Sequence, residues 1–237
     1  MNGLRAVFVK ELNEYFATPI ALAVVAVFWA LCGYLFSFNL FFVNTAQMVT
    51  SFHNMIILMI LVMPLLTMRI FAEENKTGTI ELLLTLPLND VATVLGKFFA
   101  GLFVLFLMVA GTATAVIPLV FYGNPDFGPI LGGYVGTFLF GAMFLAIGLA
   151  VSSACSNQVV AALITWGILV LLWFIDYPAA LNFIPALSAF FLHLSLSAHH
   201  VDLIRGVLSG GALVYFCSVI LFSLLVAVQV LKLRRLR

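Results

Sequence analysis

The chain has 237 residues, of which 65% are hydrophobic and only 8% are charged. Its mean hydropathy of +1.24 and its 24 phenylalanines exclude an ordinary soluble domain, in which apolar residues make up about 45–50% of the total. The formal net charge of +1 points to no nucleic-acid partner, so the placement of the few charges carries the information.

The first 18 residues are too polar to cross a membrane, and we expect them to form a helix that lies in the membrane interface. On a helical wheel one side is apolar: Leu4, Phe8, Leu12 and Tyr15. Glu11 sits close to this apolar edge, which makes the amphipathic pattern imperfect. We expect Thr18 and Pro19 to break this helix and to start the first span. A merely flexible terminus is the alternative.

Six apolar stretches are long enough to span a membrane, because a spanning helix needs roughly 20 apolar residues. They are residues 20–42, 52–71, 98–122, 130–151, 159–175 and 211–231. Their apolar runs are continuous, whereas the strands of a membrane barrel alternate at every second residue. The sequence therefore predicts an all-α integral membrane protein with six transmembrane helices, in one domain that covers residues 1–237.

One dense polar interruption follows the second span. Residues 73–76 read Glu-Glu-Asn-Lys, and we expect their charged side chains to lie in water. A short helix is predicted within residues 75–88, with Thr79 as candidate N-cap, Glu81 in the first turn and Pro87 at the end. We expect this helix to lie against the inner membrane surface. A plain connector is the alternative.

The third and fourth spans carry two further signals. Asn89 or Asp90 can cap the helix that leads into the third span, and Lys97 lies at the inner end of that span. The fourth span has small residues at spacings that let helices approach closely in lipid: Gly132, Gly136, Ala142, Ala146 and Ala150. We expect these positions to pack against a helix of the same chain or of a dimer partner, rather than to bind a ligand.

The positive charges indicate the orientation, because Lys and Arg are in excess on the cytoplasmic side of membrane proteins. If both termini share one side, every Lys and Arg except Arg205 falls on that side. We therefore expect both termini in the cytoplasm and an even number of spans. Residues 177–209 are apolar enough for a seventh crossing, but this would place the basic C-terminus outside. We interpret them as short outer re-entrant helices before the last span.

The chain lacks the residues that several kinds of chemistry require. No G-x-x-x-x-G-K-[ST] motif occurs, because Val91 stands where the first glycine before Gly96-Lys97 would be, so a phosphate-binding loop is excluded. Ionisable groups inside the spans, which ion-driven carriers generally need, are essentially absent. Three histidines and an aspartate lie near each other in the sequence but lack the spacing of a metal site, so we expect them at the membrane interface: His193, His199, His200 and Asp202. We expect no catalytic residue, cofactor or metal site in this chain.

Three stretches, in this order, form a distinctive set. They are EENKTGTIELLLTLPLNDVATVLGKFFAG at residues 73–101, SSACSNQVVAALITW from residue 152 and LSAHHVDLIRGVLSGGALVYF from residue 196. Together they resemble ABC-2-type transporter permeases, most closely the gliding-motility type and its relative in nitrous-oxide-reductase maturation. The resemblance covers nearly the whole chain. It implies one ABC-2-type transmembrane domain in a bacterial inner membrane, with an elbow helix at residues 1–18 and a cytoplasmic coupling helix at residues 75–88.

In such permeases the coupling helix docks in a groove of a separate ATP-binding subunit. The resemblance carries this docking over to Glu73, Glu74, Lys76, Thr77, Gly78, Thr79, Ile80 and Glu81. A second, smaller inner contact would consist of Ser153, Ser156, Asn157 and Gln158. The implied partners are two copies of the ATP-binding subunit, which hold ATP and Mg²⁺, and a second permease that is either the same chain or a homologue, all within membrane lipid.

The implied function is the coupling of ATP hydrolysis by a separate subunit to export or to mechanical signalling across the membrane. A dimer interface lined by Phe, Leu and Thr would favour a lipidic or amphipathic cargo. A non-transporting membrane scaffold that anchors a multiprotein assembly is the alternative, followed by a small-molecule channel or a membrane enzyme.

Overall fold

The structure is a computed structural model that describes residues 3–42, 48–80, 89–122, 126–175, 195–197, 203 and 209–235. The main elements in these ranges are α1 (Gly3–Ala17), α2 (Pro19–Phe41), α3 (Met48–Thr67), α4 (Ala72–Thr77), α6 (Asp90–Gly111), the 3-10 helix η1 (Thr112–Ala115), α7 (Val116–Tyr122), α8 (Phe127–Ala154), α9 (Gln158–Phe174) and α13 (Gly210–Arg235). All of the described secondary structure is helical, so the protein is all-α.

Within the residues that the structure describes, five helical segments are long and apolar enough to cross a membrane. They are Pro19–Phe41, Met48–Thr77, Asp90–Phe121, Phe127–Ala154 and Gly210–Arg235. The apolar helix α9 has 17 residues and falls where the sequence predicts a further span at residues 159–175. A helix of this length is about 25 Å long, which is at the lower limit for crossing the hydrocarbon core. The chain is therefore a multi-pass membrane protein.

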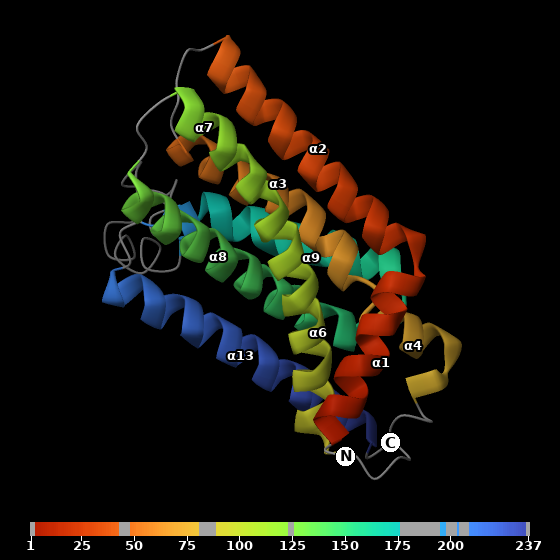
Figure 1. Ribbon diagram of the computed structural model, residues 1–237. Helices are drawn as coiled ribbons and strands as arrows, with labels where there is room; N and C mark the ends of the chain where they lie inside the picture. Colours follow the sequence, from red (N-terminus) through yellow and green to blue (C-terminus); the bar gives the residue numbers. More distant parts are fainter. Residues whose placement is uncertain are drawn as a thin grey trace.

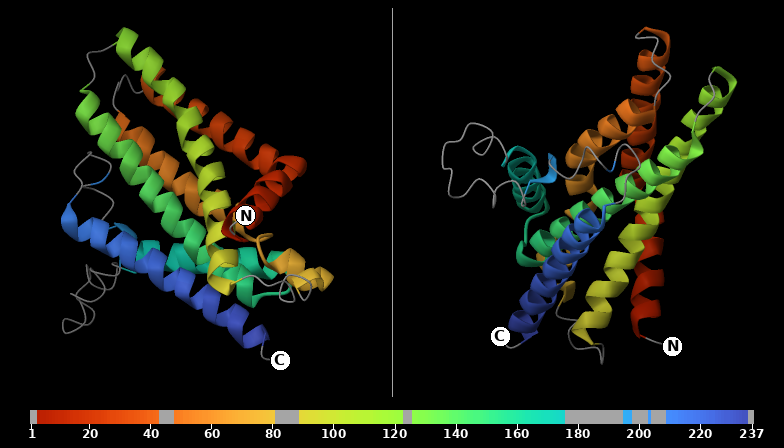
Figure 2. Two further views of the ribbon diagram at one scale, coloured as in Figure 1. Left: turned by 60° about the horizontal axis from the view of Figure 1, so that its bottom comes forward. Right: turned by 90° about the vertical axis from the view of Figure 1, so that its left-hand side faces the viewer.

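Helix α8 lies at the centre of the bundle. It packs against α3, α6, α9 and α13, and these helices surround it in Figures 1 and 2. On the α13 side, the rings of Phe140 and Phe216 meet with their centroids 4.7 Å apart. On the α3 side, a Cβ atom at Gly148 would lie 2.1 Å from the Thr67 hydroxyl oxygen, so the side chain of any other residue would push the two helices apart.

The small residues predicted for helix packing all lie on α8. Gly136, Ala142 and Ala146 are buried, and Gly132 and Ala150 are half-buried. At Gly136 the neighbour belongs to the same chain, because a Cβ atom there would lie 3.0 Å from Leu203 Cβ.

Two helix starts follow directly from the local sequence. Between α1 and α2 the chain turns sharply (Figure 1), with Thr18 in an extended conformation and Pro19 at the first helical position. This is where the sequence predicts the break before the first span. At the start of α6, the side-chain oxygen of Asn89 accepts a hydrogen bond from the Val91 amide at 3.1 Å. Of the two predicted caps, Asn89 is therefore the N-cap and Asp90 is the first helical residue.

Both termini lie at the same end of the bundle, together with α4 and the start of α6 (Figures 1 and 2). Residues 81–88, which include Glu81 and make up most of the predicted coupling helix, lie outside the described residues. The same holds for most of residues 177–209, including the predicted interfacial group of three histidines and Asp202.

Candidate functional site

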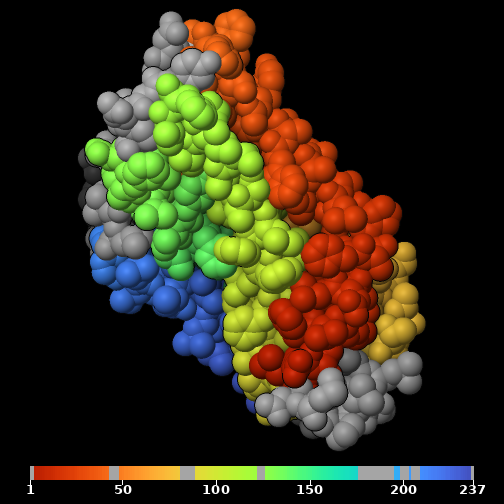
Figure 3. All heavy atoms as spheres, in the orientation of Figure 1, coloured from red at the N-terminus to blue at the C-terminus, as the bar shows by residue number. Residues whose placement is uncertain are grey.

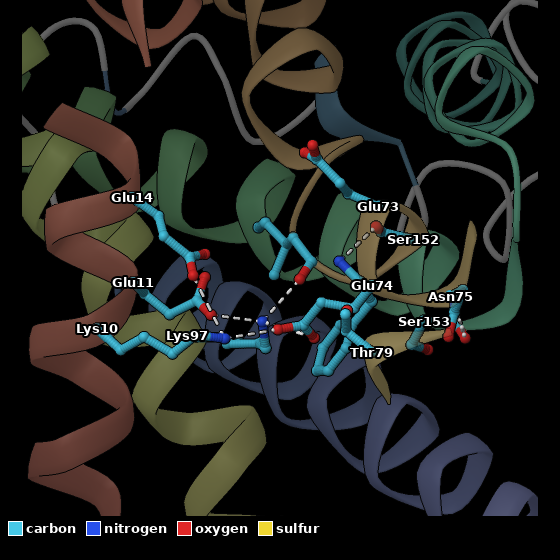
Figure 4. Close-up of polar contacts among 12 residues, drawn as sticks. Lys10, Glu11, Glu14, Glu73, Glu74, Asn75, Thr79, Lys97, Ser152 and Ser153 are labelled. Atoms are coloured by element: carbon cyan, nitrogen blue, oxygen red, sulfur yellow. Dashed lines mark hydrogen bonds and ion pairs between the residues drawn. The ribbon is translucent and has the colours of Figure 1, made fainter. Parts of the chain in front are cut away.

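The side chain of Lys97 stands at the centre of the polar contacts at this end of the bundle (Figure 4). It is almost completely buried, with 1% of its surface exposed. Its ammonium nitrogen lies 2.5 Å from Glu11 Oε1 and 3.0 Å from Glu74 Oε2. It also donates a hydrogen bond to the carbonyl oxygen of Ile70 at 2.8 Å and lies 4.8 Å from the centre of the Phe71 ring. One buried cation thus joins α1, α6 and the segment that connects α3 with α4.

Glu74 brings a second lysine, Lys10, into this cluster. Lys10 lies 3.0 Å from Glu74 Oε1 and 3.3 Å from Glu14 Oε1. Partial burial alone would lower the pKa of Lys10, but its hydrogen bond with Glu74 and the surrounding carboxylates outweigh burial and raise this pKa. Burial raises the pKa of Glu11, and the charge of Lys97 opposes that rise. We refer below to Lys10, Glu11, Glu74 and Lys97 as the charge cluster.

The approach of α1 to α6 depends on a glycine beside Lys97. A Cβ atom at Gly96 would lie 2.9 Å from Val7 Cβ and 3.1 Å from the carbonyl oxygen of Leu4. Figure 3 shows α1 lying directly against the first half of α6. The missing side chain therefore lets α1 come close enough for Glu11 to reach the buried ammonium group.

The junction between α3 and α4 is fixed by a serine of α8. The hydroxyl oxygen of Ser152 accepts hydrogen bonds from the backbone amides of Phe71 and Ala72, each at 3.1 Å. The same hydroxyl group donates to the carbonyl oxygen of Met68 at 3.2 Å. These bonds satisfy two amides at the start of α4 and a carbonyl group just after the end of α3, which are groups that helix ends leave without helical partners. As a result, the start of α4 has a fixed position on the central helix.

The side chain of Asn75 attaches α4 to the turn between α8 and α9. Its amide nitrogen donates to the carbonyl oxygens of Cys155 at 2.7 Å and Ser153 at 3.3 Å. Its oxygen accepts a hydrogen bond from Arg234 of α13 at 3.0 Å. Arg234 also donates to the carbonyl oxygen of Ala154 at 3.3 Å. α4 is therefore bound to α8, to the turn that follows α8, and to the basic end of the last helix.

The basic end of α13 makes one further contact at this end of the bundle. Arg235 Nη1 lies 3.1 Å from Asp90 Oδ1, at the first residue of α6. Positive charge at a helix C-terminus and negative charge at a helix N-terminus both complement the helix dipole. The C-terminal arginines, expected to mark the cytoplasmic side, therefore also connect α13 with α4 and α6.

The structure brings the two predicted docking segments side by side through Asn75. Their exposed residues are Lys76, Thr77, Gly78, Thr79, Ser156 and Asn157; Glu73 and Gln158 are half-buried, and Ile80 and Ser153 are buried. Gly78, with φ of +75°, ends α4 in the left-handed region that favours glycine. The side-chain amide oxygen of Asn157 accepts a hydrogen bond from the Val159 backbone amide at 2.9 Å, so Asn157 also caps α9.

One expectation for this surface is wrong. Glu74 was expected in water beside Glu73, but only 12% of its side chain is exposed, because its oxygens pair with Lys10 and Lys97. Glu73 does have an exposed side chain, at 46%, and pairs with Arg69 at 3.1 Å. The neighbouring carboxylates therefore differ in role, one inside the protein and one at its surface.

Sequence reasoning missed Asn75, Ser152 and the partners of Lys97. Two signals could have found the pairing of Glu11 with Lys97: Glu11 is an acid near the apolar side of α1, and Lys97 is a base in an otherwise apolar helix. Each breaks the local pattern, and each has the other as its partner. Nothing in the pattern around Ser152 separates it from an ordinary serine in a turn.

Comparison with known proteins agrees with this architecture. Residues 38–228, which include all the described helices from α3 to α9 and most of α13, match the family described as ABC-2 family transporter protein. No curated protein matches the chain. Permeases of this family are the transmembrane components of ABC transporters, a role that fits the apolar helices described above. Because the match covers most of its length, the chain belongs to the ABC-2 family of transporter proteins.

Proposed function

We propose that this permease couples ATP hydrolysis by a separate subunit to export or to mechanical signalling across the bacterial inner membrane. In this proposal the ATP-binding subunit docks on exposed and half-buried residues of α4, of the two residues that follow it, and of the segment between α8 and the start of α9, which we call the docking surface. It comprises Glu73, Lys76, Thr77, Gly78, Thr79, Ser156, Asn157 and Gln158. The buried Ile80 and Ser153 would support this surface from below, and Glu74 would act behind it.

The observation that carries the proposal is the attachment made by Asn75. Two segments about 80 positions apart in the chain, each assigned to docking on independent residues, are joined by its hydrogen bonds to Ser153 and Cys155. A single soluble partner could therefore contact both at once. A plain connector between two spans would need no such attachment.

The charge cluster supports a route for force from this surface into the membrane. A partner that displaces α4 also moves Glu74, and Glu74 is paired with Lys97 on α6 and with Lys10 on α1. Closure of the ATP-binding subunits on nucleotide would supply the free-energy bias, because a ligand shifts a conformational equilibrium only through different affinities for the two states. The helices α1 and α6 would then move together with α4.

The assembly proposed here contains two ATP-binding subunits and two permeases, the second permease being another copy or a homologue. ATP and Mg²⁺ belong to the ATP-binding subunits. The docking surface and both termini would face the cytoplasm. The cations Lys10, Arg69, Lys76 and Arg234 support this orientation, since they gather at the end of the bundle that carries the termini.

Co-purification tests the docking surface and separates it from the alternative of a membrane scaffold. The double charge reversal Glu73→Lys with Lys76→Glu keeps the net charge and leaves the charge cluster untouched. We expect it to abolish retention of a soluble ATPase subunit that co-purifies with the wild-type chain from its native membrane. A matched control is Asp126→Lys, because this exposed residue precedes α8, whose 28 residues separate it from the docking surface by about 42 Å.

Each result of this experiment decides between the two functions. Loss of the ATPase with the double reversal, and its retention with Asp126→Lys, supports the permease function at this surface. Retention by all variants contradicts the docking assignment. If the wild-type chain retains no ATPase but retains other membrane-bound proteins, the scaffold function is favoured.

A further inference from the structure

A pocket opens where the chain turns from α1 into α2 and faces the end of α3. Its polar lining includes Glu14, Tyr15, Arg69 and Glu73, and its apolar lining includes Ile20 and Leu65. The pocket therefore spans the boundary between the charged end of the bundle and the adjoining ends of two membrane helices, α2 and α3. Glu11 of the charge cluster forms part of the pocket wall, and the pocket is partly open at the protein surface.

A buried hydroxyl group in the pocket lining lacks a partner. The Tyr15 oxygen is inaccessible to solvent and makes no hydrogen bond within the part of the chain that the structure describes. Buried polar groups are almost always hydrogen-bonded in folded proteins, so an orphaned hydroxyl group in a pocket indicates a missing partner. The burial of this group and the nearby charges of Glu11 and Glu14 raise the pKa of Tyr15, which keeps it protonated and able to donate.

The charges around the pocket indicate what kind of ligand it would hold. The carboxylates of Glu14 and Glu73 already pair with Lys10 at 3.3 Å and with Arg69 at 3.1 Å, but about half of each side chain is exposed, at 55% and 46%, and this exposed part can receive a further cation. Arg69 contacts Glu73 through Nε at 3.1 Å, and a guanidinium group has further N–H donors that suit a phosphate group. Carboxylates outnumber the guanidinium group here, so a ligand with both a cation and a phosphate fits better than a purely anionic one.

The apolar part of the lining indicates how such a ligand is attached. Ile20 and Leu65 belong to the first turn of α2 and to the last turn of α3, and both are exposed. Since α2 and α3 are spanning helices, these side chains face the region where lipid chains begin. The pocket thus offers charged groups at head-group depth and apolar side chains directly below them.

We propose that this pocket binds a phospholipid with a primary ammonium head group, such as phosphatidylethanolamine. The ammonium group lies between the carboxylates of Glu14 and Glu73, the phosphate group contacts Arg69, and the Tyr15 hydroxyl group donates a hydrogen bond to a head-group oxygen. The acyl chains follow Ile20 and Leu65 into the membrane. Such a lipid would hold the α1–α2 turn against α3 without being transported.

Native mass spectrometry of the full chain, purified in detergent and titrated with lipid, tests this site. Phosphatidylethanolamine and phosphatidylglycerol with identical acyl chains separate recognition of the ammonium group from recognition of the phosphate group. We expect the wild-type chain to bind phosphatidylethanolamine more tightly. Tyr15→Phe and Glu14→Gln should each weaken this binding about threefold to tenfold, as expected for loss of one hydrogen bond or one charge contact.

A matched control removes a hydroxyl group elsewhere. Tyr34→Phe alters a tyrosine of α2 that is 66% exposed and lies outside the pocket, and it should leave lipid binding unchanged. Equal binding of the two lipids by the wild-type chain would overturn the proposal, as would unchanged binding by both Tyr15→Phe and Glu14→Gln. Glu73 belongs to both the pocket and the docking surface, but the measurement uses the chain without an ATPase and the variants leave Glu73 unchanged, so neither result depends on whether an ATPase docks.

Discussion

The ammonium nitrogen of Lys97 and a carboxylate oxygen of Glu11 lie 2.5 Å apart, although 86 positions separate the two residues in the chain. Both side chains are buried, with exposed fractions of 1% and 4%. Glu74 is the second carboxylate at the same ammonium group, and it starts from α4. The buried ammonium group of Lys97 on α6 thus pairs with carboxylates from α1 and from α4.

Replacement of Lys97 by methionine should destabilise the protein strongly. Two carboxylates would lose their shared cation inside the protein, and removal of one partner from a buried ion pair typically costs about 3–5 kcal/mol. We expect a loss of this size in the free energy of unfolding, measured by denaturant titration in detergent micelles. Lys76→Met, at an exposed position on α4, is the control and should change little. Equal effects of the two variants would contradict a structural role for the buried ammonium group.

Replacement of Glu11 by glutamine should have a smaller effect and should partly suppress Lys97→Met. Glu74 still compensates the charge of Lys97 when Glu11 is neutral, and burial already disfavours the charged form of Glu11. When Glu11→Gln is combined with Lys97→Met, the Glu11 carboxylate that Lys97→Met would leave without a cation is absent, so the loss of stability is smaller. A double-mutant cycle on the free energy of unfolding measures this coupling. Additive effects would show that the two residues do not interact.

The stability contributed by Lys10 should disappear at high pH. Its pKa in the folded protein is raised above the ordinary value of 10.5, so the folded state holds this proton more tightly than the unfolded state. The contribution is therefore fully present below about pH 10.5 and is lost as the pH rises through the higher folded-state pKa. The difference in melting temperature between the wild type and Lys10→Met should be constant from about pH 8 to pH 10 and should shrink above that range. A difference that stays constant up to the highest pH would contradict the pairing with Glu74.

A methyl group at Gly96 should separate α1 from α6. The added Cβ atom would lie 2.9 Å from Val7, and overpacking of this kind typically costs about 1–3 kcal/mol. We expect Gly96→Ala to lower the free energy of unfolding. Gly167→Ala is the matched control, because a Cβ atom there meets no atom within 4 Å. If the two glycine variants behave alike, close approach of α1 is not required.

The apolar helices could be predicted from the sequence because hydrophobicity is a local signal that persists over a whole helix. The break at Thr18 and Pro19 and the cap at Asn89 are local as well, since a proline ring or a short polar side chain acts on its own neighbours. Contacts between distant positions leave no such signal. The inward direction of Glu74 depends on Lys97, whose position is set only when α1 and α6 pack together.

Loss of the Asn75 side chain should free α4 from the turn after α8. Asn75→Ala removes two donated hydrogen bonds and the acceptor used by Arg234, which should cost roughly 1–3 kcal/mol in local stability. Backbone amide exchange in residues 72–77 should become faster, as measured by hydrogen–deuterium exchange. Asn13→Ala, at an exposed position of α1, is the control. Unchanged exchange in Asn75→Ala would mean that α4 is held in place by other contacts.

Cross-linking from α4 in native membranes tests the central claim most directly. In a chain whose three native cysteines are replaced, Thr77→Cys and Asp126→Cys each carry a photoreactive group at an exposed position, one on the docking surface and one at the far end of α8. We predict that the group at position 77 cross-links to a soluble ATP-binding subunit, whereas the group at position 126 does not. Cross-linking of that subunit from position 126 alone would contradict the account.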